Sequence, residues 1–486
     1  MNEILVIDVG TSSVRAGALN QEGVLHSVVS VPTLPSTPNP GIVEVDGDLI
    51  AKNALELSRQ VIESVGSVSG VAITNQRATT LVWDRNTGEL VCPGIGWQDL
   101  RTVITCIVLQ EQGLRLSPSH SGPKLQSILD ACDKDRTKEL CFGTIDTWIA
   151  WKLNGQTGDK ALHVTDVTNA SATGMATSDF SKWDKDVLAA LNIDSSMLPE
   201  IKSSSEFMGE AKVLKGSPPI IAIAGDQQAS LVGQACYKPG LAKATFGTGG
   251  MLDQFVGPTR PKFMDLGPNG TTSFAAFKIE NSPTVFEVEA LMLSAGSAIE
   301  WLRDDLGIIS SSEESDELAR QSADNSDVWF VPALLGLGTP VWDFGARGTF
   351  VGITRGTGRA EMVRAVLEGI AQRGADMVEA AEGDSQLSIP SLRIDGGMSA
   401  NKTFVQALAN ACQRPIEVSK ELEATTIGAA FLGAVYLSWY KGMDDISSNW
   451  SPKEVVEPNG PSRRERWLEA RARSLKTIPE LSAINF

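Results

Sequence analysis

A carboxylate at the end of an apolar run is the first group in this sequence whose setting suits chemistry. Residues 219–224 read PIIAIA, which predicts a short buried strand, and Gly225-Asp226-Gln227-Gln228 follows it. An acid between a glycine and two amides can accept a proton from an attacking hydroxyl group. The same position is also typical of an aspartate that caps the next helix, and local spacing alone favours the cap.

A turn rich in glycine and hydroxyl groups lies near the N-terminus. Residues 4–20 read ILVIDVGTSSVRAGALN, where an apolar run ends at Asp8 and period-two alternation resumes after the turn. This predicts strand, tight turn, strand, whereas a Walker or dinucleotide-binding loop passes into a helix. Asp8 could hold Mg²⁺ through its waters. An ordinary hairpin explains the same pattern, but the turn also offers hydroxyl and N–H groups to phosphate oxygens, from Thr11, Ser12 and Ser13.

A second turn of this kind lies half a chain later. Residues 241–255 read LAKATFGTGGMLDQF and place Gly-Thr-Gly, residues 247–249, between two strand-like runs. Two turns that close on one triphosphate explain the repetition better than two unrelated hairpins, so the sequence predicts two related lobes that face each other. Gly396 and Gly397 follow another predicted strand and let the backbone approach a ligand, although this pattern alone favours a plain strand–helix turn.

Composition restricts the class of protein. The 486 residues predict two or three domains, and the net charge of −17 argues against a nucleic acid or an anionic membrane as the main partner. Six scattered cysteines without a C-x-x-C pair suit reduced thiols. We expect a cytoplasmic protein, because we find neither a signal peptide nor an apolar run of about 18 residues.

In this order, the motifs resemble the FGGY carbohydrate kinases, and within that family the glycerol kinases most closely. The similarity runs from Ile7 to about Leu437. The segments that carry it include ITNQR at 73–77, GWQDLRT at 96–102, GDQQASL at 225–231, GLGTPVWDFGARG at 336–348 and RIDGGMSAN at 393–401.

The resemblance implies the fold and the division of labour. It implies an α/β protein with the actin-like ATPase (ribonuclease H-like) fold, in which two lobes enclose a central cleft for ATP and substrate. Residues 1–240 would form the N-terminal lobe, with the acceptor site and the first phosphate loop. Residues 241–486 would form the C-terminal lobe, with most of the nucleotide site and the second phosphate loop.

The resemblance also implies roles for particular residues. ATP would be bound by Thr11, Ser12, Ser13, Arg15, Thr248, Gly296, Gly397 and Asn401. The acceptor would be bound by Arg77, Trp97, Asp226 and Gln227, with Asp226 as the general base. Mg²⁺ would lie near Asp8. Glu300 stands where glycerol kinases often carry glutamine, so it is expected to be a weak nucleotide contact.

The acceptor site departs from the glycerol kinase pattern. Ala78 replaces a glutamate that grips glycerol, Ser119 a tyrosine, Met251 a phenylalanine and Ser127 a tryptophan. Each loss removes a hydroxyl ligand or a wall of the small pocket, so a larger polyol or a pentulose is the alternative acceptor.

Two other classes stay open at this point. One is a nucleotide-binding regulator that has lost transfer activity, and the other is an actin-like filament or chaperone ATPase, which would share the fold but not GDQQ or WQDLRT. The resemblance also implies that the protein forms a homo-oligomer.

Overall fold

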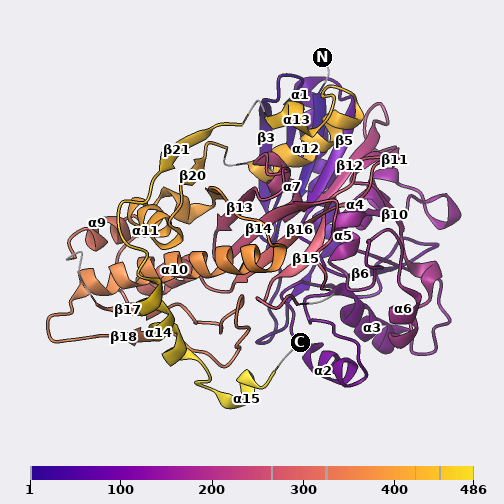
Figure 1. Cartoon of the computed structure of the whole chain (residues 1–486). Coiled ribbons are helices and arrows are strands. Elements are labelled where there is room, and N and C mark those ends of the chain that lie inside the picture. Colours follow the sequence, from indigo (N-terminus) through magenta and orange to yellow (C-terminus); the bar gives the residue numbers. More distant parts are fainter. Residues whose placement is uncertain (1–2, 264–265, 323–326, 422, 448–449, 485–486) are drawn as a thin grey trace.

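Two large β-sheets organise the chain (Figure 1). The computed structural model describes residues 3–263, 266–322, 327–421, 423–447 and 450–484. The first sheet has the order β11-β12-β5-β1-β2-β3. Its strands are β1 (Glu3–Val9), β2 (Ser13–Asn20), β3 (Leu25–Pro32), β5 (Gly70–Asn75), β11 (Ser205–Glu210) and β12 (Pro219–Gly225).

The first sheet is covered on both faces, which explains its apolar centre. Strands β1, β5 and β12 are parallel, and parallel strands are typically buried on both sides. On β1, Leu5 and Ile7 pack with α1 (Gly47–Val65) and α4 (Ile145–Asn154). Ile4 and Val6 pack on the opposite face, with α7 (Asp226–Gly233) and α12 (Ala424–Tyr436).

The second sheet has the order β15-β16-β14-β13-β19-β20-β21. Its strands are β13 (Ala242–Phe246), β14 (Gly250–Gly257), β15 (Thr272–Phe277), β16 (Val285–Met292), β19 (Leu392–Asp395), β20 (Ile416–Ser419) and β21 (Pro452–Val456). One face packs against the long helix α10 (Arg359–Ser385) and α11 (Lys402–Cys412). That face carries Leu252, Val288 and Ala290, so the alternate residues of β14 and β16 point the other way.

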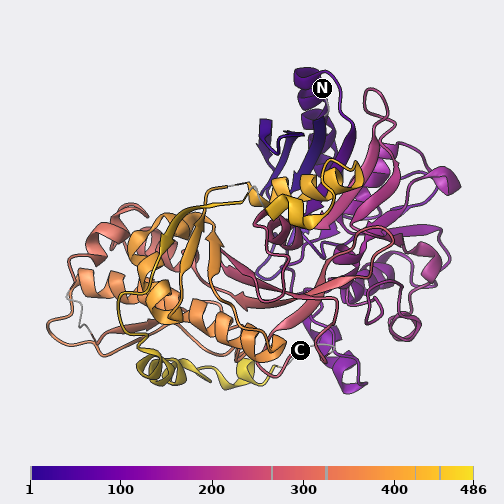
Figure 2. The ribbon, with the colours of Figure 1, turned by 45° about the horizontal axis from the view of Figure 1, so that its top comes forward.

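Helix α12 comes late in the sequence but packs on the first sheet, next to the strands of the N-terminal part of the chain (Figure 2). It crosses α7 at two glycines. A Cβ atom on Gly428 would lie 1.8 Å from the carbonyl oxygen of Ala229, and one on Gly233 would lie 1.9 Å from that of Ala424. Only glycine permits this backbone contact. The predicted division of the chain into two lobes between residues 240 and 241 stays a prediction. Helix α12 follows this division in the sequence but packs against strands and a helix that precede it.

Smaller elements complete the two lobes. The short strands are β4 (Glu44–Val45), β6 (Leu81–Asp84), β7 (Gly94–Ile95), β8 (Leu140–Gly143), β9 (Val164–Asp166), β10 (Glu200–Lys202), β17 (Trp329–Val331) and β18 (Thr349–Val351). The remaining α-helices are α2 (Val103–Glu111), α3 (Ser121–Cys132), α5 (Val167–Ser171), α6 (Lys185–Ala190), α8 (Gly296–Glu300), α9 (Glu314–Ala319), α13 (Met443–Ser447), α14 (Arg464–Ser474) and α15 (Pro479–Ser482). Among the described residues, no helix is both long enough and apolar enough to span a bilayer.

The C-terminal tail is integrated more deeply than its charged sequence suggests. The charged sequence of residues 450–486 predicts a peripheral helix, but β21 extends the second sheet and Trp467 of α14 is fully buried. The indole nitrogen of Trp467 donates to Asp376 at 3.1 Å, and Arg464 and Arg471 pair with the same carboxylate. The arginines of this helix therefore bind a buried acid of α10, which a reading of surface charge could not reveal.

Candidate active site

A cavity of about 470 Å³ receives residues from both lobes. Thr11 reaches it from the β1–β2 turn and Asp226 from the start of α7, while Met251 and Glu289 reach it from β14 and β16. Five of the predicted site residues line it together, namely Thr11, Arg77, Trp97, Asp226 and Gln227. A cavity of this size is typical of a small-molecule site.

Asp226 is the first residue of α7, where the buried strand β12 ends. The N-cap of α7 is Gly225. The alternative that Asp226 caps the helix is therefore wrong, because Asp226 is already inside it. The Gln227 amide donates to Oδ1 of Asp226 at 2.9 Å, and Nε of Arg77 lies 3.8 Å from the same oxygen. Burial raises the pKa of Asp226, and the positive charge of Arg77 opposes the rise. A carboxylate with a raised pKa beside a cavity is suited to take a proton.

Arg77 and Trp97 are held by specific partners. Nη2 of Arg77 donates to Glu289, and its guanidinium lies 4.9 Å from the ring centroid of Phe274. The indole nitrogen of Trp97 donates to the hydroxyl of Thr11 at 3.2 Å. One predicted acceptor residue, Trp97, is thus bonded directly to the β1–β2 turn, the first of the two predicted phosphate turns.

Three of the four departures from the glycerol kinase pattern border the cavity, at Ala78, Ser119 and Met251. Ala78 has a φ of 60°, the left-handed region that costs most side chains free energy, of order 1 kcal/mol. Its carbonyl accepts from Ser121 at 3.1 Å and from Nζ of the buried Lys124 at 3.2 Å, which hold this backbone in place. Ser127 lies on α3 and does not line the cavity, so the expectation that it removes a pocket wall is wrong.

The second predicted phosphate turn, residues 247–249, is supported by the start of α8. Gly296 donates to the carbonyl of Gly247 at 2.8 Å, and Ala295 to that of Thr248 at 2.9 Å. A Cβ atom on Gly296 would lie 2.6 Å from the same Gly247 oxygen, so this close approach requires glycine. Apart from the adjacent residues, no atom in the described part of the chain lies within 4 Å of a Cβ built on Gly247 or Gly397, so both glycines border open space.

Two predicted nucleotide residues are already engaged in the protein. Oδ1 of Asn401 caps α11 by accepting from Phe404 at 2.9 Å, and its Nδ2 donates to Ser315 at 3.0 Å. Arg15 donates to Glu423 and lies 3.7 Å from Asp8. Ser12, Ser13 and Thr248 occupy the two turns as expected, Glu300 is exposed, and their contacts with a nucleotide stay predictions.

Asp8 has the chemistry of a ligand for a divalent cation. Its side chain is mostly buried and accepts from the Thr426 hydroxyl at 3.1 Å. Burial raises its pKa to about 6, Arg15 opposes the rise, and the nearby charge of Asp226 reinforces it. A hard cation would offset the negative charge of a buried carboxylate that lies near a second acid, so Asp8 fits the expected Mg²⁺.

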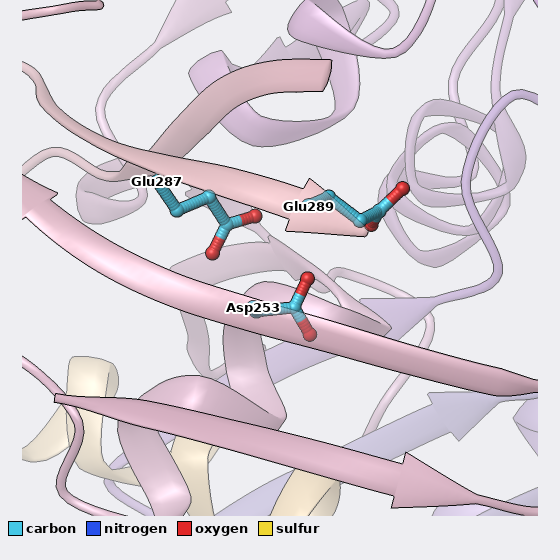
Figure 3. A group of neighbouring side chains, drawn as sticks. All are labelled: Asp253, Glu287 and Glu289. Carbon is cyan, nitrogen blue, oxygen red and sulfur yellow. The ribbon is translucent and has the colours of Figure 1, made fainter. Parts of the chain in front are cut away.

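Four charged residues of the second sheet were not identified from the sequence. Asp253, Glu287 and Glu289 point toward one another from β14 and β16 (Figure 3), and Lys243 of β13 lies 2.7 Å from Asp253. Lys243 also donates to Gln227 at 2.6 Å, next to Asp226. The signal was present in residues 285–291, VFEVEAL, where acids alternate with apolar residues as on one face of a strand.

Glu287 gives a prediction about stability and pH. It is fully buried, accepts from Gln228 at 2.5 Å, and has a second oxygen without a hydrogen-bond partner among the described residues. Burial, reinforced by Asp253, raises its pKa well above the usual value. The folded state therefore holds a proton that the unfolded state releases, so this carboxyl makes the protein less stable as pH rises above about 4.5.

We expect Glu287→Gln to raise the free energy of unfolding at pH 8 by roughly 1–3 kcal/mol and much less at pH 5. Urea unfolding at both pH values checks this, and an equal gain at both contradicts it.

The fold and the site place the chain in a known class. Residues 3–233 match the N-terminal domain of the FGGY family of carbohydrate kinases, and residues 243–437 match its C-terminal domain. The chain belongs to this family and has its actin-like ATPase fold, as the motifs predicted. The kinase activity that the resemblance implied is likewise confirmed at the level of the family.

Individual relatives are similar over nearly their whole length. Glycerol kinase 2 of Thermotoga maritima is 39% identical, with 98% of this chain and 99% of that protein covered. The crystal structure of Plasmodium falciparum glycerol kinase with ADP is 29% identical, has a TM-score of 0.89 and covers 98% of each chain. A ligand-bound xylulose kinase from Lactobacillus acidophilus has a TM-score of 0.85 at 22% identity, over 99% of each chain, and shares the fold.

Proposed function

We propose that this chain transfers the terminal phosphoryl group of ATP to a hydroxyl group of a polyol or keto sugar larger than glycerol. The observation that carries the proposal is the composition of the cavity beside Asp226. Ala78, Ser119 and Met251 border it, at the positions where the glycerol kinase pattern has a carboxylate and two aromatic rings. The space that these changes open lies next to the proposed base, so a longer acceptor fits there.

The side chains divide the work as follows. Arg77 and Trp97 seat the acceptor, and Asp226 accepts the proton of the attacking hydroxyl as it reacts. Catalysis of phosphoryl transfer rests mainly on positioning and on charge, so no further covalent chemistry is required of the protein. The two Gly-Thr turns would bind the phosphates, and Mg²⁺ held near Asp8 would supply charge neutralisation.

The acceptor is tested with glycerol, erythritol, ribitol, xylitol and D-xylulose in a coupled assay of ADP release. We expect kcat/KM for a four- or five-carbon compound to exceed that for glycerol by at least about tenfold, because sites that hydrogen-bond hydroxyl groups discriminate sharply. Glycerol as the best acceptor would contradict the larger-acceptor proposal. Tight ATP binding without turnover of any acceptor would instead favour the nucleotide-binding regulator. Homo-oligomerisation and a cytoplasmic location stay predictions.

A further inference from the structure

Glu289 is the member of the carboxylate group that reaches the acceptor cavity. It lines the cavity with Arg77 and Met251, and its side chain is 11% exposed. On the second sheet it pairs with Asp253 across the β14–β16 ladder, and the next residues on the same face, Met251 and Leu291, also line the cavity. Its carboxylate therefore lies at the inner end of the cavity wall.

The two acids behind Glu289 have partners of their own. Asp253 and Glu287 are fully buried and do not line the cavity. Asp253 pairs with Lys243, and Glu287 accepts from Gln228. Figure 3 shows all three carboxylates together, on the neighbouring strands β14 and β16. The two buried acids are thus held by Lys243 and Gln228. On the side of the cavity, Glu289 accepts a hydrogen bond from Arg77.

Arg77 supplies an independent sign that a ligand binds here. Its side chain is 9% exposed, and Nη1 is buried without a hydrogen-bond partner among the described residues. An unsatisfied buried donor of a charged group is costly, so an oxygen atom of a ligand is the natural partner. Because Nη1 and Nη2 end the same planar guanidinium, an oxygen on Nη1 lies close to the carboxylate bound to Nη2. The pair offers a donor and an acceptor side by side.

We propose that Glu289 is a specificity-determining residue that accepts a hydrogen bond from an acceptor hydroxyl other than the one phosphorylated. It would act together with Nη1 of Arg77 on a vicinal diol and would replace the carboxylate that Ala78 lacks. This inference rests on the proposed function and deepens it. The expected substrates are polyols or keto sugars in which one hydroxyl group faces Asp226 and a vicinal diol elsewhere in the molecule contacts Glu289.

The test compares Glu289→Gln with wild type on the best acceptor of the panel and on its analogue lacking one hydroxyl group. We expect the acceptor KM to rise roughly 10- to 100-fold, because a hydrogen bond to a charged group is lost. Changes in kcat and in the KM for ATP should stay below about threefold, and the variant should discriminate less between polyol and deoxy analogue than wild type does. Glu289→Asp, which keeps the charge, should fall between the two.

Glu287→Gln is the matched control, because it replaces a carboxyl group of the same cluster that does not line the cavity. Its acceptor KM should equal that of wild type. An unchanged acceptor KM in Glu289→Gln, or a loss confined to kcat, overturns the inference while the proposed function stands. If wild type phosphorylates none of the acceptors, the proposed function itself fails and the inference falls with it.

Discussion

Asp226→Asn is expected to lower kcat for acceptor phosphorylation by roughly 10²- to 10⁴-fold, the range typical of a lost general base. The amide cannot take the proton, although it keeps the size of the carboxylate and can still accept from the Gln227 amide. ATP affinity should change little, because the phosphate turns are untouched. Steady-state kinetics with separate titration of ATP and acceptor measure the effect.

A matched control for this substitution lies in the same lobe. Asp46 caps α1 through the Leu49 amide at 2.9 Å and does not line the cavity. Asparagine is an equally good cap, so Asp46→Asn should leave kcat within about threefold of wild type. A kcat that survives in Asp226→Asn would remove Asp226 from the role of base, since phosphoryl transfer would then proceed without it.

Ala78→Glu is expected to raise kcat/KM for glycerol by roughly 10- to 100-fold, because it restores a charged acceptor of hydroxyl hydrogen bonds at the cavity wall. The backbone at residue 78 is already in the left-handed region, so a glutamate meets about the same strain as the alanine. The larger side chain should also lower kcat/KM for five-carbon acceptors. The acceptor panel measures both changes.

Ala78→Gly is the control that distinguishes the effect of an added carboxylate from the effect of backbone strain at residue 78. Glycine relieves the strain at φ 60° but adds no ligand, so it should stabilise the fold slightly and leave glycerol turnover unchanged. If Ala78→Glu does not improve glycerol turnover even when combined with Ser119→Tyr, the altered residues do not set the choice of acceptor.

The sequence predicted the elements that carry their own local signals. The strand–turn–strand unit at residues 4–20 and the strand that ends beside Asp226 are present as expected. The pattern of residues 359–375 predicts a helix, and α10 begins at Arg359 but continues to Ser385, because its buried residues extend to Ala381. Local spacing could not show that Asp226 faces a cavity, since that depends on Arg77 and Glu289, which come from distant parts of the chain.

Long-range packing explains what the sequence could not predict. Ser127 stands at the position of a family tryptophan, yet it lies on α3 and does not line the cavity. The acids at 253, 287 and 289 come together only when β14 and β16 pair, and Lys243 joins them from a third strand. The contact of α14 with Asp376 likewise joins segments about 90 residues apart. Such contacts follow from strand register and helix packing, which no single segment encodes.

The glycine crossing of α7 and α12 bears on how the chain can be divided. Ile427, Phe431 and Leu432 of α12 belong to the same apolar cluster as Ile4 and Ile221 of the first sheet. A fragment cut after residue 240 would lack the cavity residues Met251 and Glu289, and it would expose this apolar surface to water. The two halves of the gene are therefore not interchangeable modules. A first lobe moved between relatives needs residues 424–436 with it, and acceptor specificity also depends on Met251 and Glu289 of the second lobe.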